Sequence, residues 1–375
     1  MKKFLSILTV LLFVFAIGTH FVQAADIADV VYSETNSVVG TSPAASDTLV
    51  TFTETTALVG GDYIVLTFPT GTVLNTANIV ASDFTIEEDA GTATSPSVIS
   101  VNASARTIAM YIHAASLADG AGVYTIKLSA TAGGDEIVNP TAITTTGTFS
   151  VATFASGVAA DSGADTDVTF THDAASQFAI INPTDGTVDA AITVTVQLQD
   201  QYGNIVTTGG DKDKDVTLTA DGDATGAGLV AITDGTGTKA ISDETAETVN
   251  LGLTDSETTD YTVTSTQNVV FGPGAVDNIY VSAQPSIGYT YVDFATQPVV
   301  QVRDQYSNIV TSDNSPISIE AYTADNFAGS KTEFTGTTLV YATDDGLVGG
   351  TADGIATFSG VKYNTINNTG IYLCA

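Results

Sequence analysis

The sequence has no tryptophan, a single cysteine, three histidines and only 10 lysine and arginine residues among 375. Against 42 aspartate and glutamate residues this gives a formal net charge of -32 at pH 7. Such a surface repels phosphate backbones and anionic lipid headgroups, so we expect no nucleic-acid partner. The lone cysteine, Cys374, cannot form a disulfide within the chain, so stability must come from hydrophobic cores.

Groups that carry catalysis are also scarce. His113 and His172 lie far apart in the sequence, and no local signature of a nucleophile or zinc site accompanies either one. No phosphate-binding glycine loop of the Walker type is present. The lack of tryptophan disfavours a cleft that stacks sugars. The paired carboxylates of a glycosidase are not excluded, because aspartate and glutamate occur throughout the sequence. We therefore predict that the protein is not an enzyme.

The first 24 residues have the layout of a secretory signal peptide. Lys2 and Lys3 precede an apolar run over 4–17, and a small-residue site ends at Ala24. The run is shorter than the roughly 20 residues of a membrane span, and an uncleaved anchor is the alternative. We expect an exported chain that is secreted or cell-surface, with no membrane span after cleavage.

The 43% of hydrophobic residues are arranged with period two, which predicts an all-β protein. Alternating apolar and polar positions predict half-buried strands over 64–68, 107–113, 123–128 and 192–198. Clusters of Gly, Asp, Asn and Ser at short spacing separate these runs, which is typical of antiparallel sandwiches. Threonine, whose β-branched side chain suits a strand's solvent face, is abundant.

An internal repeat sets the expected domain size. The segment 200–207, Asp-Gln-Tyr-Gly-Asn-Ile-Val-Thr, recurs at 304–311 with Ser307 in place of Gly203. The segments that lead into the two units, 168–180 and 269–281, also resemble each other. We therefore predict three modules after the signal peptide, at 25–173, 174–274 and 275–375, and expect the last to be truncated in its final strand, as in a fragment of a longer chain.

The repeated segment resembles bacterial immunoglobulin-like repeats of the invasin and intimin type. The likeness rests on strand-D-x-x-G-N-x-V at 194–207 and 300–311, on G-x-A-x-F at 354–358 and on Tyr-Leu-Cys-Ala at 372–375 in the last strand, where the family has Y-x-L-x-A. The first unit lacks the G-x-A-x-F segment. Residues 25–173 resemble immunoglobulin-like modules of bacterial and archaeal surface proteins through shorter motifs. The resemblance implies tandem immunoglobulin-like β-sandwich domains that serve as stalks or adhesive surfaces.

The chemistry of the repeated motif is that of a tight turn. Its aspartates can accept backbone N–H groups, while Gly203 and the asparagines tolerate a positive φ. We interpret the motif as a structural hairpin after which pairing restarts. The predicted turn residues are Asp200, Gly203, Asn204, Asp304 and Asn308.

Calcium is the one cofactor for which the sequence makes a case, because Ca²⁺ prefers several carboxylate oxygens. Four aspartates crowd the predicted junction between the first two modules: Asp161, Asp165, Asp167 and Asp173. Three more alternate at 211–215, where Lys212 and Lys214 interrupt them. The alternative is a solvated acidic loop that keeps the protein soluble.

Together these features predict a non-catalytic secreted or cell-surface rod that acts in adhesion or as a stalk or S-layer component. Its partner would be an unidentified surface, glycan or protein receptor, or further repeats of the same chain. Two alternatives stay open. The modules could be accessory parts of a longer secreted hydrolase, or calcium-dependent structural modules.

Overall fold

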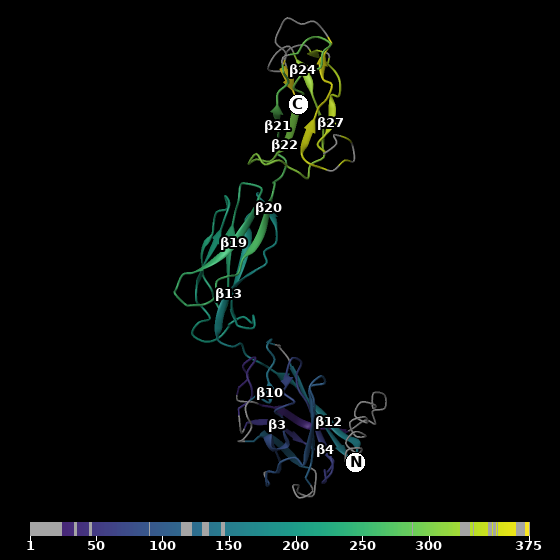
Figure 1. The fold of residues 1–375 in the computed structure, drawn as a ribbon, viewed down its shortest axis with the longest axis vertical. Helices are drawn as coiled ribbons and strands as arrows, with labels where there is room; N and C mark the ends of the chain where they lie inside the picture. Colours follow the sequence, from purple (N-terminus) through teal and green to yellow (C-terminus); the bar gives the residue numbers. More distant parts are fainter. Residues whose placement is uncertain are drawn as a thin grey trace. The chain divides into compact units, whose positions relative to one another are not determined.

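The computed structural model describes residues 25–374, apart from 34–35, 45–46, 90, 114–121, 130–134, 144–146, 287, 323–330, 333, 344–346, 348–349, 351 and 365–371. The predicted signal peptide lies outside the described residues. Those described form β-strands joined by turns, with one short 3-10 helix at Ala81–Asp83 (Figure 1). The all-β prediction is confirmed.

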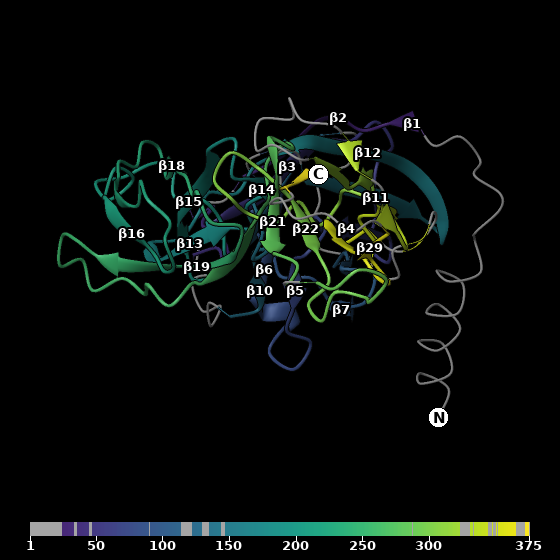
Figure 2. The same cartoon turned by 90° about the horizontal axis from the view of Figure 1, so that it is seen from above.

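The first sandwich has two main sheets. One has six strands in the order β1-β12-β11-β4-β8-β7, the other has four in the order β2-β3-β9-β6, and β5 pairs with β10. The long strands β11 and β12 lie side by side (Figure 2). The bounds are β1 (Ala25–Asp26), β2 (Ala28–Tyr32), β3 (Thr48–Thr53), β4 (Tyr63–Thr67), β5 (Val73–Leu74), β6 (Phe84–Glu88), β7 (Val98–Asn102), β8 (Thr107–Tyr111), β9 (Val123–Leu128), β10 (Ile137–Val138), β11 (Gly147–Ala155) and β12 (Val158–Val168).

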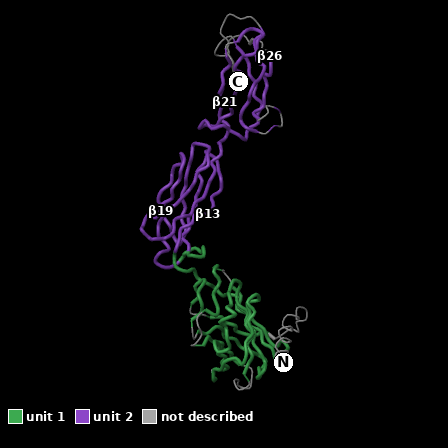
Figure 3. The backbone as a smooth tube through the Cα atoms, viewed as in Figure 1, with its two compact units in different colours: residues 1–175, 200–207 green, residues 176–199, 208–375 purple. Residues whose placement is uncertain are grey.

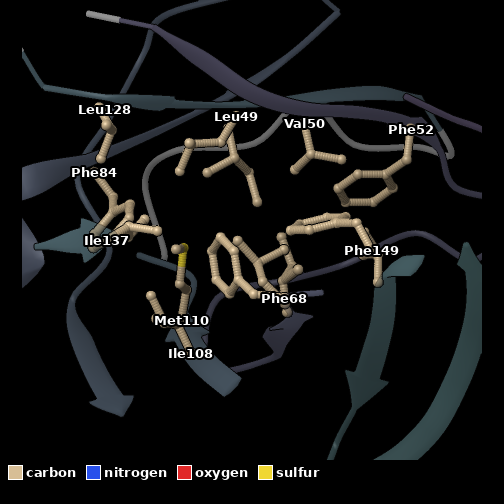
Figure 4. Packing of buried hydrophobic residues seen from close by; sticks show 14 of the residues in the cluster. Leu49, Val50, Phe52, Phe68, Phe84, Ile108, Met110, Leu128, Ile137 and Phe149 are labelled. Atoms are coloured by element: carbon tan, nitrogen blue, oxygen red, sulfur yellow. The ribbon is translucent and has the colours of Figure 1, made fainter. Parts of the chain in front are cut away.

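Alternating side chains build this sandwich, as the sequence predicts. In β9, Tyr124, Ile126 and Leu128 are buried, while the residues between them are exposed or half-buried. The inward faces of the two sheets meet in one core (Figure 4). Phe68 and Phe149 pack edge to face there, with ring centroids 5.2 Å apart. Burial of such rings supplies the main driving force for folding a chain that cannot form an internal disulfide.

The second sandwich follows the same rules with fewer strands. A three-stranded sheet, β13-β15-β18, accompanies a five-stranded sheet, β14-β20-β19-β16-β17. In β15 the residues Ile192, Val194, Val196 and Leu198 are all buried, which confirms the predicted strand face. The bounds are β13 (Ala175–Ile181), β14 (Gly186–Thr187), β15 (Ile192–Asp200), β16 (Val216–Ala220), β17 (Gly228–Val230), β18 (Thr236–Ile241), β19 (Thr248–Asp255) and β20 (Gln267–Gly272).

The third sandwich consists of shorter strands around its own apolar cluster, which includes Phe294, Val300, Val302 and Phe358. Its sheets are β21-β22-β28, β23-β27, β25-β24-β30 and β26-β29. The bounds are β21 (Asn278–Ala283), β22 (Val299–Arg303), β23 (Pro316–Ser318), β24 (Glu320–Tyr322), β25 (Lys331–Thr332), β26 (Phe334–Thr335), β27 (Leu339–Tyr341), β28 (Ile355–Thr357), β29 (Lys362–Tyr363) and β30 (Tyr372–Cys374).

The chain divides into two compact units, coloured separately in Figure 3. The first contains residues 1–175 together with 200–207, and the second contains 176–199 and 208–375. The repeated segment 200–207 thus belongs with the first unit rather than with the strand that leads into it. The predicted boundaries near 173 and 274 stay predictions, although each sheet above uses strands from one predicted module only.

Candidate functional site

Three of the four aspartates predicted to hold calcium, Asp161, Asp165 and Asp173, accept hydrogen bonds through their carboxylates. Asp161, in β12, is buried, and its Oδ2 accepts hydrogen bonds from the backbone of Thr55 (3.2 Å) and Thr56 (2.9 Å). The hydroxyl of Thr55 donates to the same oxygen at 2.9 Å. Asp161 therefore fixes the segment that follows β3.

The other three lie further along the chain. Asp165 accepts from the backbone N–H of Tyr32 (Oδ2, 3.0 Å) and of Asp167 (Oδ1, 3.0 Å), and Asp167 is exposed. Asp173 Oδ2 accepts from the side chain of Gln201 at 2.7 Å. Among the residues that the structure describes, no three acidic, histidine or cysteine side chains are placed to hold a metal ion. The calcium site stays a prediction.

A second acidic side chain lies beside Asp161, and the sequence analysis did not single it out. Glu54 is 1% exposed, and the Thr153 hydroxyl donates to its Oε1 at 2.8 Å. Burial raises the pKa of Glu54 to about 8; the nearby charges of Asp161 and Asp62 act in the same direction, against the Thr153 hydrogen bond. Glu54 is therefore protonated at neutral pH. It follows the last residue of β3, and no sequence motif marks it.

Of the aspartates at 211–215, Asp213 forms an ion pair with a neighbouring lysine. Lys212 pairs with Asp213 at 2.8 Å and with Asp234 at 2.7 Å. Lys214 pairs with Glu257 at 3.1 Å. These ion pairs are exposed, as the solvated-loop alternative predicts, and Lys212 occupies the carboxylate of Asp213. Whether this run binds calcium stays a prediction.

The repeated motif forms the same turn twice. In the first copy, Asp200 Oδ1 accepts from the backbone N–H of Tyr202 and Asn204, each at 2.9 Å. Gly203 donates its backbone N–H to Asp200 O at 3.1 Å and has a φ of 87°. The carboxylate at the start of the turn thus replaces the backbone partners that a tight turn leaves unpaired.

In the second copy, Asp304 Oδ1 accepts from Tyr306 and Asn308, again at 2.9 Å each. Ser307 donates to Asp304 O at 3.1 Å and has a φ of 76°. The positive φ therefore falls on Gly203 and Ser307, and not on the asparagines that we also considered for it. Pairing restarts after the second turn with a bridge between Arg303 and Ile309, and Val310 N donates to Val302 O at 2.9 Å.

The asparagines have a role that the hairpin interpretation missed. Asn204 Nδ2 donates to the backbone oxygen of Thr141 at 2.8 Å, and its Oδ1 accepts from the backbone of Ile143 at 3.0 Å. Asn308 does the same with Glu244 O (2.8 Å) and Ala246 N (2.9 Å). In each case the partner loop lies about 60 residues earlier in the chain. The identical asparagine in both copies was the one available sequence signal.

The aspartates also bind the segments that precede their modules. Asp200 Oδ2 accepts from Asp173 N at 3.0 Å, and Asp304 Oδ2 accepts from Gly274 N at 2.8 Å. Burial alone would raise the pKa of both carboxyls. The hydrogen bonds, chiefly from Asn204 and from Gly274 respectively, outweigh burial, so both pKa values lie below the ordinary 3.8.

One turn of the third sandwich exposes aromatic side chains. Tyr289 is 78% exposed and Tyr291 is 69% exposed, and Val292 beside them is 54% exposed. The turn is held by hydrogen bonds from Val292 N to Tyr289 O (3.0 Å) and from Tyr291 N to Tyr363 O (2.8 Å). These bonds hold the backbone of the turn. Tyrosine side chains provide a large contact area with few rotatable bonds, which is a property of binding loops.

Comparison with known proteins gives structural similarity only. No family model matches the chain, and no curated protein matches it. Among solved structures it is similar to the Escherichia coli adhesin FdeC (17% identity, 92% of this chain and 94% of that one, TM-score 0.30) and to invasin, a bacterial integrin-binding protein (13%, 92% and 56%, TM-score 0.30). It is also similar to a β-glycosidase from Bacteroides vulgatus (9%, 62% and 24%, TM-score 0.24).

The similar structures include proteins of the type that the repeated motif resembles. TM-scores this low carry no argument about function, so the proposal below rests on the residues themselves. None of the described residues forms a helix long and apolar enough to cross a bilayer.

Proposed function

We propose that this chain is a non-catalytic, exported protein whose tandem sandwiches present a binding surface at the cell exterior, in adhesion or as a stalk. The observation that carries the proposal is the repeated turn, which makes the same set of hydrogen bonds in two places about 100 residues apart. The repeated feature is a turn that connects segments of the chain, and not a reactive group. Such repetition is typical of proteins built from stacked structural modules.

The exposed turn at 289–292 is the binding surface that we propose. Tyr289 and Tyr291 bring large rings into solvent, where they can pack on a protein or stack on a sugar. The receptor is therefore a protein or glycan surface, while the strongly acidic chain is repelled by nucleic acid and by anionic lipid.

Adhesion of coated beads tests this function. Beads carrying the chain from residue 25 onward are applied to epithelial cells, matrix proteins and a glycan array, beside beads carrying the Tyr289→Ser, Tyr291→Ser double variant. We expect binding to one receptor class and a loss of at least tenfold in the double variant. Leu229→Ser, an exposed apolar residue in the second sandwich, is the matched control and should bind normally. Equal binding by all three proteins would remove the turn from the proposal.

The accessory-module alternative differs in the natural polypeptide rather than in these residues. If the modules serve a hydrolase, the intact mass of the native protein includes a catalytic domain and culture fluid hydrolyses a polymer. If they serve adhesion, antibody against 174–375 labels intact cells and no such activity accompanies the protein.

A further inference from the structure

The side chain of Asn308 binds a loop of the second sandwich, and it contacts only backbone atoms of that loop. Its side-chain amide donates to Glu244 O and accepts from Ala246 N, two groups that a strand would present to a neighbouring strand. The amide therefore acts as a substitute peptide group. Both sandwiches lie in the same compact unit, so this contact is part of that unit's structure.

The connecting segment between these sandwiches is held from both sides. Asp304, in the third sandwich, accepts from Gly274 N, while Asp189, in the second, accepts from Ala275 N at 2.7 Å. Gln305 closes the arrangement by donating to Asp189 Oδ1 at 3.2 Å. A Cβ on Gly274 would collide with the Asp189 carboxylate, so the segment approaches as closely as glycine allows.

The partner loops share geometry but not sequence. Asn204 binds the oxygen of Thr141 and the N–H of Ile143, whereas Asn308 binds those of Glu244 and Ala246. In both loops the oxygen and the N–H are two residues apart. An asparagine that recognises only backbone groups needs no particular side chain on its partner.

We infer that Asn308, through its hydrogen bonds to backbone groups of the loop at 244–246, couples the stability of the third sandwich to that of the second. When the second sandwich opens, Asn308 loses both loop partners and Asp304 loses an ordered linker. The Asp304 carboxylate is buried and the Asn308 amide is half-buried. Loss of hydrogen bonds by such groups costs more than loss of a fully exposed hydrogen bond would. This goes beyond the proposed binding function and does not depend on it.

The absence of tryptophan allows each sandwich to be followed separately in the full chain. Tyr261→Trp reports on the second sandwich, where it packs near Phe178, and Tyr363→Trp reports on the third, near Phe294. The second sandwich is then weakened at a distance by Leu251→Ala, a buried residue of β19. We measure whether the urea midpoint of the third sandwich responds.

With Asn308 present, we expect Leu251→Ala to lower the midpoint of the Tyr363→Trp reporter, corresponding to about a tenfold change in its unfolding constant. In the Asn308→Ala background the third sandwich should no longer respond. Asn278→Ala, an exposed asparagine of the same sandwich, should leave the response intact. The inference would be overturned if Leu251→Ala left the urea midpoint of the third sandwich unchanged, or if it lowered that midpoint equally in the Asn308→Ala background.

Two further variants keep the test decisive if Asn308→Ala fails to fold. Ala246→Pro removes the donor N–H from the loop with Asn308 unchanged, and it should abolish the response. Replacement of Glu244, Thr245 and Ala246 by the Thr-Ala-Ile of 141–143 should preserve it, because the backbone groups stay. Loss of the response in that replacement would mean that loop side chains, and not the backbone, are recognised.

Discussion

Gly203 and Ser307 occupy the same position in two copies of one turn, and both have a left-handed backbone, with φ values of 87° and 76°. Glycine adopts this conformation freely, whereas a residue with a Cβ is strained by roughly 1–2 kcal/mol. The two copies therefore differ in stored strain at a single, matched site.

Exchange of these residues should shift stability in opposite directions. Ser307→Gly relieves the strain and should stabilise the third sandwich by about 0.5–1 kcal/mol, after the entropy that glycine gains in the unfolded chain. Gly203→Ser should destabilise its turn by about 1 kcal/mol. Urea midpoints measure both; a destabilising Ser307→Gly would show that the serine hydroxyl has a structural role.

The pH dependence of the first sandwich should depend on Glu54. Its folded-state pKa of about 8 lies above the ordinary 4.5, so between these values the folded state keeps a proton that the unfolded state has lost. This stabilisation is complete below about pH 4.5, decreases as pH rises and is gone above about pH 8. The unfolding constant should increase by about tenfold per pH unit across that window.

Glu54→Gln should remove that dependence, because glutamine imitates the protonated acid. A Tyr111→Trp reporter in the first sandwich would show equal midpoints for both proteins in acid and a more stable Glu54→Gln protein at pH 9. Asp167→Asn, an exposed acid in β12, is the control and should keep the original profile. If Glu54→Gln is weaker at pH 9, the carboxyl is ionised in the folded protein.

The turn aspartates should act at the opposite end of the pH scale. The folded-state pKa values of Asp200 and Asp304 are below 3.8, so their contribution is present above about pH 4 and is lost as pH falls through the folded-state values. Asp304→Asn should therefore flatten the acid limb of the Tyr363→Trp reporter. An unchanged acid limb would mean that other carboxylates dominate there.

The predicted calcium site is tested by melting with and without the ion. If Asp161, Asp165, Asp167 and Asp173 bind Ca²⁺, millimolar calcium should raise the melting temperature by mass action, and magnesium should not. Asp165→Asn with Asp167→Asn should then remove the shift. The same melting temperature with and without calcium would withdraw the prediction.

Local sequence patterns predict strands such as 123–128 and 192–198, but not the contacts of Asn204 and Asn308 with distant loops. Alternation in 123–128 and 192–198 reflects a face that each strand must bury, which is a property of the segment itself. The turn at 200–207 was predicted because Asp and Gly act on their own neighbours. The partners of Asn204 and Asn308 lie about 60 residues away and are backbone groups, so no side-chain pattern marks them.

The acidic side chains show the same limit. The sequence predicts Asp161 in a calcium cluster at the module junction, because four aspartates are close in sequence. The alternation of inward and outward side chains in β12 instead buries Asp161 against the segment after β3. Glu54 follows the last residue of β3, and its burial depends on how two sheets pack. Burial of a carboxyl is a tertiary property, so composition and spacing could not show it.

The proposed function requires that the natural protein is exposed on the cells that make it and mediates their attachment. Intact cells would be labelled with antibody against 174–375, treated with protease without lysis, and assayed for adhesion before and after. We expect surface labelling that protease removes, together with reduced adhesion. Antigen that is accessible only after lysis, or adhesion unchanged by its removal, would contradict the proposed function.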